Sequence, residues 1–254
     1  MNRWTHWILE QIKLFWQAKT YRAAASHRTP ESGLPAKEVN FVLSGDGAVF
    51  KLLTQGWERK GTDMRFEETP IKGAWTIDLE PHQDERGFFA DLFCQKELMD
   101  HGLCAQFVQA KNSLSKEKGT LRGLHYQLPP KAQDKLVRCI RGRIWDVLLD
   151  LRPHSSSFGQ WFGTELSAEN RRMLYVPKGF AHAFLTLESD CELLYFVTDT
   201  YAPELERGIR WNDPCHDIAW PLPPQVLSHR DESHPDWNPA HHLGLQHTVL
   251  TGAS

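Results

Sequence analysis

The chain has 254 residues, of which 41% are hydrophobic and 24% are charged. This composition suits one large folded domain or two small ones and excludes disorder along the whole chain. The 29 Lys and Arg residues and the 32 Asp and Glu residues give a formal net charge of −3, so nothing predicts a nucleic-acid partner, and the apolar runs stay well short of the roughly 20 residues that a membrane span requires.

The first 63 residues differ from the rest of the chain. They contain nine Lys and Arg residues against six Asp and Glu residues. Ile8, Ile12 and Phe15 recur at helical spacing, which predicts a short amphipathic helix. Residues 23–63 are rich in Ser, Pro, Gly and charged side chains, as linkers are. We therefore expect residues 1–63 to be an accessory N-terminal segment that is partly disordered.

Short alternating runs fill residues 64–237. In residues 144–151, Trp145, Val147 and Leu149 share one strand face, and this period of two predicts a half-buried strand. Similar runs recur, separated by turns that contain Pro, Gly and Ser. Many short strands with little helical periodicity predict an all-β sandwich or barrel.

Residues 238–254 show no period and are predicted to form a flexible tail. Three of them are histidines, His241, His242 and His247, and no Cys, Asp or Glu stands nearby to complete a metal site. The pattern favours a surface tail over a metal centre.

The five cysteines are dispersed through the chain and form no CxxC motif. Their odd number and spacing argue against a disulfide framework and against a thiolate zinc site. The cytoplasm is the predicted location, because thiols stay reduced there.

The most informative stretch is GTLRGLHYQLPPKAQDKLVRCIRG, residues 119–142. A strand with His125 runs into a Pro-Pro turn, and a second strand with Lys135 follows, so an antiparallel hairpin is expected to bring the imidazole and the ammonium to one site. Arg122 lies three residues before His125, and a regular strand would place the two on opposite faces. A bulge at Gly123 would relieve this.

Longer motifs follow one another in the β-rich part of the chain: DERGFFADLF (84–93), FVQAKNSLSKEKGTLRGLHYQ (107–127), DKLVRCIRGRIWDVLLDLR (134–152), YVPKGFAHAF (175–184), YFVTDTYAPELERGIRWNDP (195–214), IAWP (218–221) and LSHRD (227–231). In this order they resemble the dTDP-4-dehydrorhamnose 3,5-epimerase family, the metal-free cupin enzymes of deoxysugar nucleotide synthesis. A metal-dependent cupin would instead show HxH and a downstream carboxylate, whereas His125 is followed by Tyr126 and Gln127.

The resemblance implies a cupin jelly-roll β-sandwich over residues 64–237, no cofactor, no metal and a homodimer that exchanges an N-terminal strand. The implied substrate is a nucleoside diphosphate linked to a 4-keto-6-deoxy hexose. Epimerisation beside a ketone requires a base for the α-proton, a cation or donor for the enolate oxygen, and an acid on the opposite face of the ring.

The family motifs assign these catalytic roles to four residues. His125 would be the base, and Asp231 would bond the far nitrogen of its ring. Lys135 would face the enolate oxygen. Tyr195 matches the family's acid, although the ordinary pKa of tyrosine, about 10, makes it a reluctant donor.

The resemblance also implies residues that bind the diphosphate or the sugar. Arginine suits this task because its planar fork can pair with two oxygens. Two positions depart from the family pattern: an aspartate stands where the family has a glutamate, and a spacer residue shifts the usual QxN motif. The implied binding residues are Arg86, Asp91, Gln109, Asn112, Arg122, His182, Glu206 and Arg230, of which Arg86 and Asp91 would serve the partner's site in an exchanged dimer.

These residues predict an epimerase that inverts C3 and C5 of dTDP-4-dehydro-6-deoxy-D-glucose. An enzyme that inverts only C3 or only C5 would use the same base and stays open. A catalytically silent sugar-nucleotide-binding cupin is a second alternative, but it has no need for an acid and a base together. A metal oxygenase is a third, which metal analysis would separate.

Overall fold

The computed structural model describes residues 64–244. The helix and linker predicted within residues 1–63 lie outside the described residues, as does the last part of the predicted tail, residues 245–254. No helix within residues 64–244 is long and apolar enough to cross a membrane.

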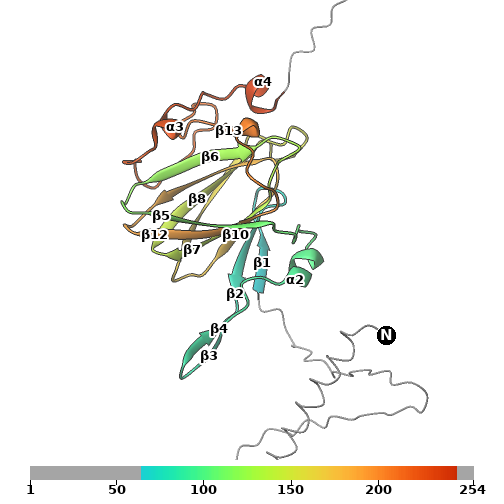
Figure 1. Cartoon of the computed structure of the whole chain (residues 1–254), viewed down its shortest axis with the longest axis vertical. Helices are drawn as coiled ribbons and strands as arrows, with labels where there is room; N and C mark the ends of the chain where they lie inside the picture. The colour runs from blue at the N-terminus through green and yellow to red at the C-terminus, as the bar shows by residue number, and fades with distance from the viewer. Residues whose placement is uncertain (1–63, 245–254) are drawn as a thin grey trace, which may run out of the picture. The chain divides into compact units, whose positions relative to one another are not determined.

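Two antiparallel sheets face each other in a sandwich (Figure 1), which confirms the all-β prediction. The six-stranded sheet has the spatial order β1 (Met64–Glu68), β2 (Trp75–Leu79), β10 (Met173–Val176), β7 (Lys135–Arg141), β12 (Cys191–Val197) and β5 (Gln109–Ser115). The five-stranded sheet has the order β13 (Glu206–Gly208), β6 (Leu121–Gln127), β11 (Phe180–Thr186), β8 (Arg143–Asp150) and β9 (Trp161–Ser167). The short helices are α2 (Gln95–Asp100), the 3₁₀ turn η1 (Pro203–Leu205), α3 (His229–Glu232) and α4 (Pro239–His242).

The main core fills the space between the sheets. Val137 and Leu193 from the six-stranded sheet pack in one cluster with Ile144, Leu148 and Leu166 from the five-stranded sheet, all at most 1% exposed. The alternation along each strand supplies these inward side chains, and their burial is the main favourable contribution to folding.

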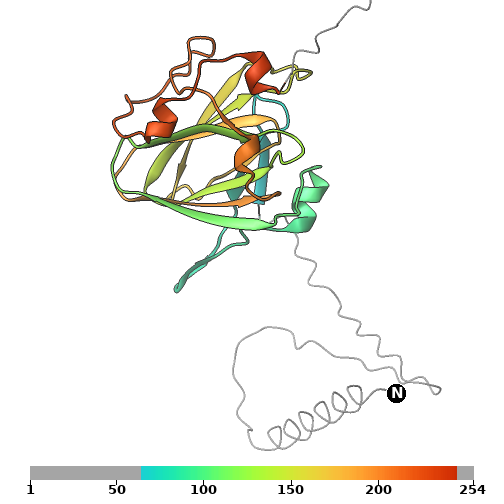
Figure 2. The same cartoon turned by 45° about the horizontal axis from the view of Figure 1, so that its top comes forward.

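Strand β8 is buried more completely than the alternation predicted. Val147 and Leu149, on its other face, are also fully buried, because they pack against Ile209 and the partly buried Trp237 and Leu243 from the C-terminal part of the chain. Figure 2 shows this part lying over the five-stranded sheet. The prediction of a half-buried strand is therefore wrong: this sheet is covered on both faces.

The first residues of the predicted tail are ordered. Helix α4 places His242 in a fully buried position, where its backbone carbonyl accepts a hydrogen bond from the Tyr126 hydroxyl at 2.8 Å. His242 is thus a core histidine and not part of a flexible tail. The packing of Trp237 against the His242 ring, with centroids 5.1 Å apart, extends the folded domain past the predicted boundary at residue 237.

Strands β6 and β7 do not form the predicted hairpin. β6 pairs with β11 and β13, and β7 pairs with β10 and β12. The Pro-Pro turn between them therefore carries the chain from one sheet to the other. His125 and Lys135 still meet, but they meet across the interior of the sandwich.

The hairpin of β3 (His82–Asp84) and β4 (Gly87–Phe89) extends away from both sheets (Figure 1). All six of its strand residues are exposed. Phe88 and Phe89 are 48% and 62% exposed, which is unusual for two neighbouring aromatic side chains.

Candidate active site

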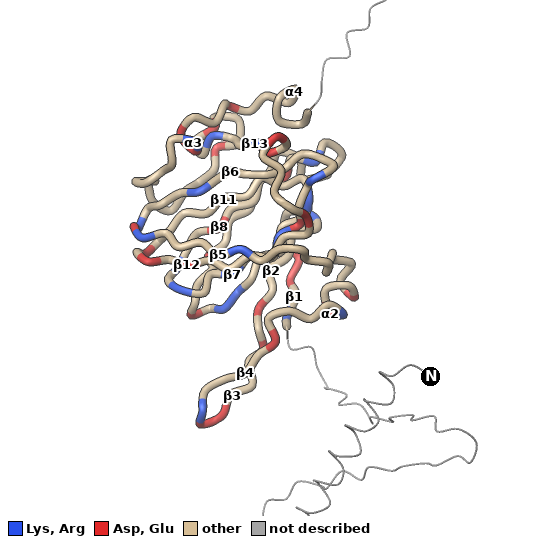
Figure 3. Tube along the Cα trace, viewed as in Figure 1, with Lys and Arg blue, Asp and Glu red and all other residues tan. Residues whose placement is uncertain are grey.

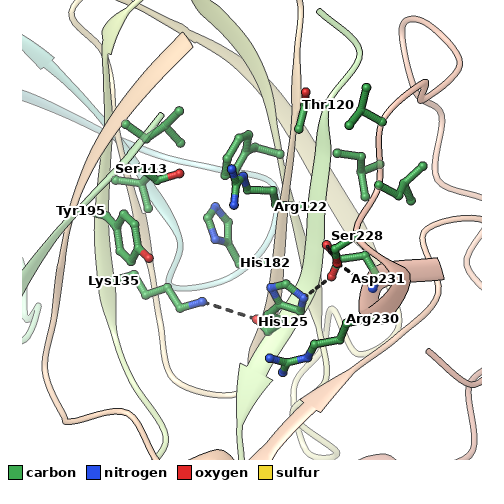
Figure 4. A pocket seen from close by; sticks show the side chains of 16 residues that line it. Ser113, Thr120, Arg122, His125, Lys135, His182, Tyr195, Ser228, Arg230 and Asp231 are labelled. Atoms are coloured by element: carbon green, nitrogen blue, oxygen red, sulfur yellow. Dashed lines mark hydrogen bonds and ion pairs between the residues drawn. The ribbon is translucent and has the colours of Figure 1, made fainter. Parts of the chain in front are cut away.

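A cavity of about 530 Å³ opens between the two sheets. Both sheets and the segment that leads into α3 contribute side chains to it (Figure 4). The predicted site residues that line it are Arg122, His125, Lys135, His182, Tyr195, Arg230 and Asp231. Sequence positions from 122 to 231 are thus brought to one place by the closure of the sandwich.

His125 and Asp231 form a hydrogen-bonded pair. The His125 Nε2 lies 2.6 Å from Asp231 Oδ1, and the Asp231 side chain is only 5% exposed. Ser228, the N-cap of α3, fixes the carboxylate, because its hydroxyl donates to Asp231 Oδ2 at 2.9 Å and accepts from the Asp231 backbone N–H at 3.1 Å. Burial acts to raise the pKa of Asp231, but hydrogen bonds, first that of His125, hold this pKa well below its usual range.

This pairing sets the tautomer of His125. An ionised carboxylate can only accept, so Nε2 carries the proton and Nδ1 keeps a free lone pair. Burial lowers the pKa of His125, against the hydrogen bond to Asp231 that acts to raise it. Figure 4 shows the second ring nitrogen on the cavity side. The neutral ring thus presents a proton acceptor to the cavity.

Lys135 brings an ammonium to the same place from β7. Its Nζ donates to the backbone carbonyl of His125 at 3.4 Å. Burial lowers the pKa of this ammonium to about 8, although Asp146 acts to raise it. A cation that is shielded from water can stabilise a developing negative charge strongly.

Tyr195 lies on β12 across the cavity from His125 (Figure 4). Burial raises the pKa of its hydroxyl, and the positive charge of Arg122 opposes this rise. The two walls of the cavity therefore hold one proton acceptor and one proton donor.

The predicted bulge at Gly123 is confirmed. The pairing of β6 with β11 shifts register between His182 and Phe184, opposite this glycine, and Arg122 and His125 both line the cavity. Gly123 has a φ of +122°, and an added Cβ would lie 2.5 Å from the Cβ of Ala183, so only glycine fits.

Two further predicted binding residues are held by charged partners: His182, which lines the cavity, and Glu206, which does not line it but pairs with the lining residue Arg230. The His182 Nε2 lies 2.9 Å from Oδ1 of Asp146, a fully buried carboxylate. At the other side, Glu206 pairs with Arg230 and accepts a hydrogen bond from the Tyr201 hydroxyl. Burial acts to raise the pKa of Glu206, but these two contacts hold it below its usual range.

The model of the dTDP-4-dehydrorhamnose 3,5-epimerase family matches residues 68–239, more than half of the chain. The chain belongs to this family. A curated member from Shigella flexneri is 48% identical over 66% of this chain and 93% of its own length. The crystal structure of the Bacillus anthracis enzyme with TDP and PPi bound is 42% identical, has a TM-score of 0.67 and covers 68% of this chain and 99% of that chain. The Legionella pneumophila enzyme, solved in complex with dTDP-4-keto-L-rhamnose, is 43% identical with a TM-score of 0.64 and covers 67% of this chain and 91% of that chain.

Membership in the epimerase family does not bring every implied binding residue to this cavity. Arg86 lies in the turn of the β3–β4 hairpin, paired with Asp84, and its side chain is 82% exposed. Asp91 follows the same hairpin. Neither residue lines the cavity between the sheets, because the hairpin extends away from this chain's own sandwich.

The prediction for Asn112 needs a correction. Its side chain donates to Glu192 Oε1 at 2.9 Å, on the opposite strand face from Ser113, which lines the cavity. Because strand faces alternate, Gln109 and Lys111 share the face of Ser113. The Lys111 ammonium lies 5.4 Å from the ring centre of Tyr201. The alternation along β5 would have selected Lys111 over Asn112.

One further residue beside the dyad escaped the sequence analysis. His234 follows α3, and its Nε2 lies 3.6 Å from Asp231 Oδ1. Its ring centre is 5.4 Å from that of His125, at an interplanar angle of 78°. The spacing of three residues from Asp231, one helical turn, is the signal that could have found it.

Proposed function

We propose that this chain is a dTDP-4-dehydrorhamnose 3,5-epimerase, which inverts C3 and C5 of dTDP-4-dehydro-6-deoxy-D-glucose in dTDP-L-rhamnose biosynthesis. The observation that carries the proposal is one cavity with a carboxylate-bound histidine on one wall and a buried tyrosine on the other. Family membership supplies the substrate class, and members of the family need no cofactor.

The first step is removal of the proton on the carbon beside the ketone. Nδ1 of His125 accepts this proton, and the electron pair of the C–H bond moves into the enolate. Asp231 stabilises the imidazolium that forms, because its carboxylate already accepts from Nε2.

The enolate oxygen is stabilised by Lys135. Its ammonium is held in place before the reaction and is shielded from water, so its attraction for the developing charge is stronger than it would be in solvent. Its lowered pKa, about 8, leaves it mostly protonated at neutral pH.

Tyr195 returns a proton to the carbon from the opposite side, which inverts the configuration. The hydroxyl is a weak acid, and the nearby charge of Arg122 helps to stabilise the phenolate that it leaves. The cycle closes when the phenolate is reprotonated and His125 releases its proton, both through solvent.

The binding roles rest on charge and position. Arg122 and Arg230 stand at the cavity and can each pair two oxygens of a diphosphate. His182, held by Asp146, lines the same space and suits a sugar hydroxyl. We assign Glu206, which pairs with the lining residue Arg230, to the sugar hydroxyls as well. Gln109 would contact the substrate from the end of β5.

The homodimer and the exchanged hairpin are part of the proposal. The exposed Phe88 and Phe89 would be covered by a second copy of the chain, and Arg86 would then reach the partner's cavity. This exchange can be tested by complementation. When Arg86→Ala and His125→Asn chains are mixed in equal amounts and reassembled, the mixture should regain about a quarter of wild-type activity, because half of the dimers are hybrids and each hybrid has one intact site. Mixtures that stay inactive would place Arg86 in its own chain's site or exclude the dimer.

Solvent exchange tests the activity itself. In deuterated water the wild-type chain should place deuterium at both C3 and C5 of the substrate, with inversion at both carbons, read by NMR. Label and inversion at one carbon alone would identify a 3-only or 5-only epimerase. Unlabelled substrate that nevertheless binds would identify a silent binding protein.

A further inference from the structure

The catalytic pair has a third potential metal ligand next to it. The atoms His125 Nε2, Asp231 Oδ1 and His234 Nε2 all lie within 4.8 Å of one another. His234 Nε2 is buried and has no hydrogen-bond partner in the described part of the chain. Asp231 Oδ1 lies 3.6 Å from this nitrogen, beyond hydrogen-bond distance. A buried ring nitrogen without a hydrogen bond is costly and suggests a ligand that the atom can bind.

We propose that His125, Asp231 and His234 form a zinc-binding site and that zinc bound there inhibits the enzyme. Zinc would bind Nε2 of His125, the ring nitrogen that must carry the proton for Nδ1 to act as the base. The inhibition rests on the proposed function, whereas the zinc site does not. Two imidazoles and one carboxylate with an open fourth position are a ligand set that Zn²⁺ favours.

The geometry is close to what zinc requires. Tetrahedral bonds of 2.0 to 2.2 Å separate ligand atoms by about 3.3 Å. Here Asp231 Oδ1 lies 2.6 Å from His125 Nε2 and 3.6 Å from His234 Nε2, so small rotations of the rings suffice. Zinc would replace the proton between His125 and Asp231.

The three side chains are held firmly. His125 lies on β6, and Asp231 lies in the short helix α3, capped by Ser228. The ring of His234 lies directly over Gly208 of β13, where an added Cβ would be 2.2 Å from the ring. The side chains of Asp231 and His234 are only 5% and 11% exposed, so the site is sheltered. His125 and Asp231 also line the cavity, which connects the site to it.

Zinc inhibits through the tautomer of His125. In the metal-free pair the proton is on Nε2 and the lone pair on Nδ1 is the base. A neutral imidazole has one N–H, so zinc on Nε2 moves that proton to Nδ1. Nδ1 then has no lone pair for the α-proton, and catalysis stops although the cavity itself is not filled.

Zinc titration of the full chain tests the site, with Mg²⁺ as a control because it prefers oxygen ligands. The His234→Gln variant should need about tenfold more zinc, or more, for half inhibition, each enzyme being compared with its own rate after EDTA treatment. His229→Gln removes an exposed histidine of the same helix and should behave as wild type. Because zinc also binds the substrate's diphosphate, the test relies on the difference in zinc sensitivity between His234→Gln and His229→Gln. Equal zinc sensitivity of the two variants would overturn the site.

A second measurement needs no substrate. Ring ¹⁵N NMR of the histidines, with His125 assigned from the His125→Asn variant, should show its protonated nitrogen change from Nε2 to Nδ1 as zinc is added. A competing zinc indicator should show weaker binding to His234→Gln than to His229→Gln. An unchanged His125 signal at saturating zinc would overturn the proposal. A chain that binds zinc in this way but never turns over the 4-keto sugar would refute the proposed function and leave the zinc site standing.

Discussion

The two walls of the cavity control their ionisable groups by different means. On the five-stranded wall, His125 and His182 each place Nε2 against a buried carboxylate, Asp231 or Asp146. Burial is the largest influence on the pKa of His125 too, but on the six-stranded wall it acts without a hydrogen-bonded carboxylate among the described residues: it lowers the pKa of Lys135 to about 8 and raises that of Tyr195. One wall therefore fixes a tautomer, and the other wall leaves a cation and a hydroxyl poorly solvated. Opposite walls reach opposite faces of a sugar ring, which is the arrangement that inversion requires.

The largest effect on the comparison between the two walls is expected when the base, His125, is removed. His125→Asn should lower turnover by roughly 10²- to 10⁴-fold, since general-base catalysis has this value. Exchange of the α-protons should fall by the same factor, and nucleotide affinity should stay near normal. The exposed His154→Asn is the matched control. A His125→Asn enzyme that keeps a tenth of the wild-type rate would show that the base is another group.

Loss of the acid should slow the return of the proton but leave its removal by His125 intact. In Tyr195→Phe, His125 still exchanges the α-proton with solvent, but proton return from the other side becomes slow. Deuterium should therefore enter the 4-keto sugar while little epimer forms, with C5 affected at least as strongly as C3. Tyr126→Phe removes a hydroxyl that bonds the His242 carbonyl, outside the cavity, and should keep exchange and inversion together. Equal loss of both in Tyr195→Phe would indicate that this residue positions the substrate.

Weakening the carboxylate should have a smaller effect than removing the base. Asp231→Asn leaves His125 in place but no longer stabilises its imidazolium, so turnover should fall by at least about tenfold. Exchange and inversion should fall together, since both depend on the base. Asp236→Asn, which changes an exposed partner of Arg210, should stay within about twofold of wild type. Wild-type turnover in Asp231→Asn would show that the Asp231 carboxylate does not contribute to catalysis.

The pH dependence of kcat/KM should have one limb from a group on each wall of the cavity. Lys135 loses its charge as the pH rises through about 8, so kcat/KM of the EDTA-treated enzyme should fall about tenfold per pH unit above that value. His125 must be neutral, and its lowered pKa places the acid limb below pH 6.5. In Lys135→Arg the alkaline limb should disappear near pH 8 while the acid limb stays, because arginine keeps its charge. An unchanged alkaline limb in that variant would assign it to another group.

The smallest effect is expected from removal of residues 1–63. Every residue with a proposed role in catalysis or substrate binding lies between Arg86 and Asp231, so a chain that starts at Met64 should keep the oligomeric state of the full chain and turn over within about threefold of it. Size-exclusion chromatography with light scattering and steady-state kinetics measure the two properties. Aggregation, or a loss above about tenfold in an intact dimer, would make residues 1–63 part of the enzyme and contradict the proposed domain boundary.

The sequence predicted the sandwich and most of the site because both leave local patterns. Alternation revealed the strands, and Gly123 revealed the bulge that places Arg122 beside His125. The ordered motifs identified the family and, with it, His125, Lys135, Tyr195 and Asp231. The same period of two on β5 places Lys111, and not Asn112, on the face that Ser113 shares with the cavity, which the shifted QxN motif alone does not show.

Only the tertiary structure decided which strands pair and what covers them. Alternation shows which side chains share a face but not which strand lies next to it, so β6 and β7 were expected to pair although they belong to opposite sheets. The C-terminal part of the chain appeared to be a tail, since its apolar side chains have no period, yet Trp237, His242 and Leu243 cover the five-stranded sheet. His234 became significant only through its position over Gly208 beside Asp231. Contacts between residues far apart in sequence depend on the packing of the whole domain, and no local pattern records them.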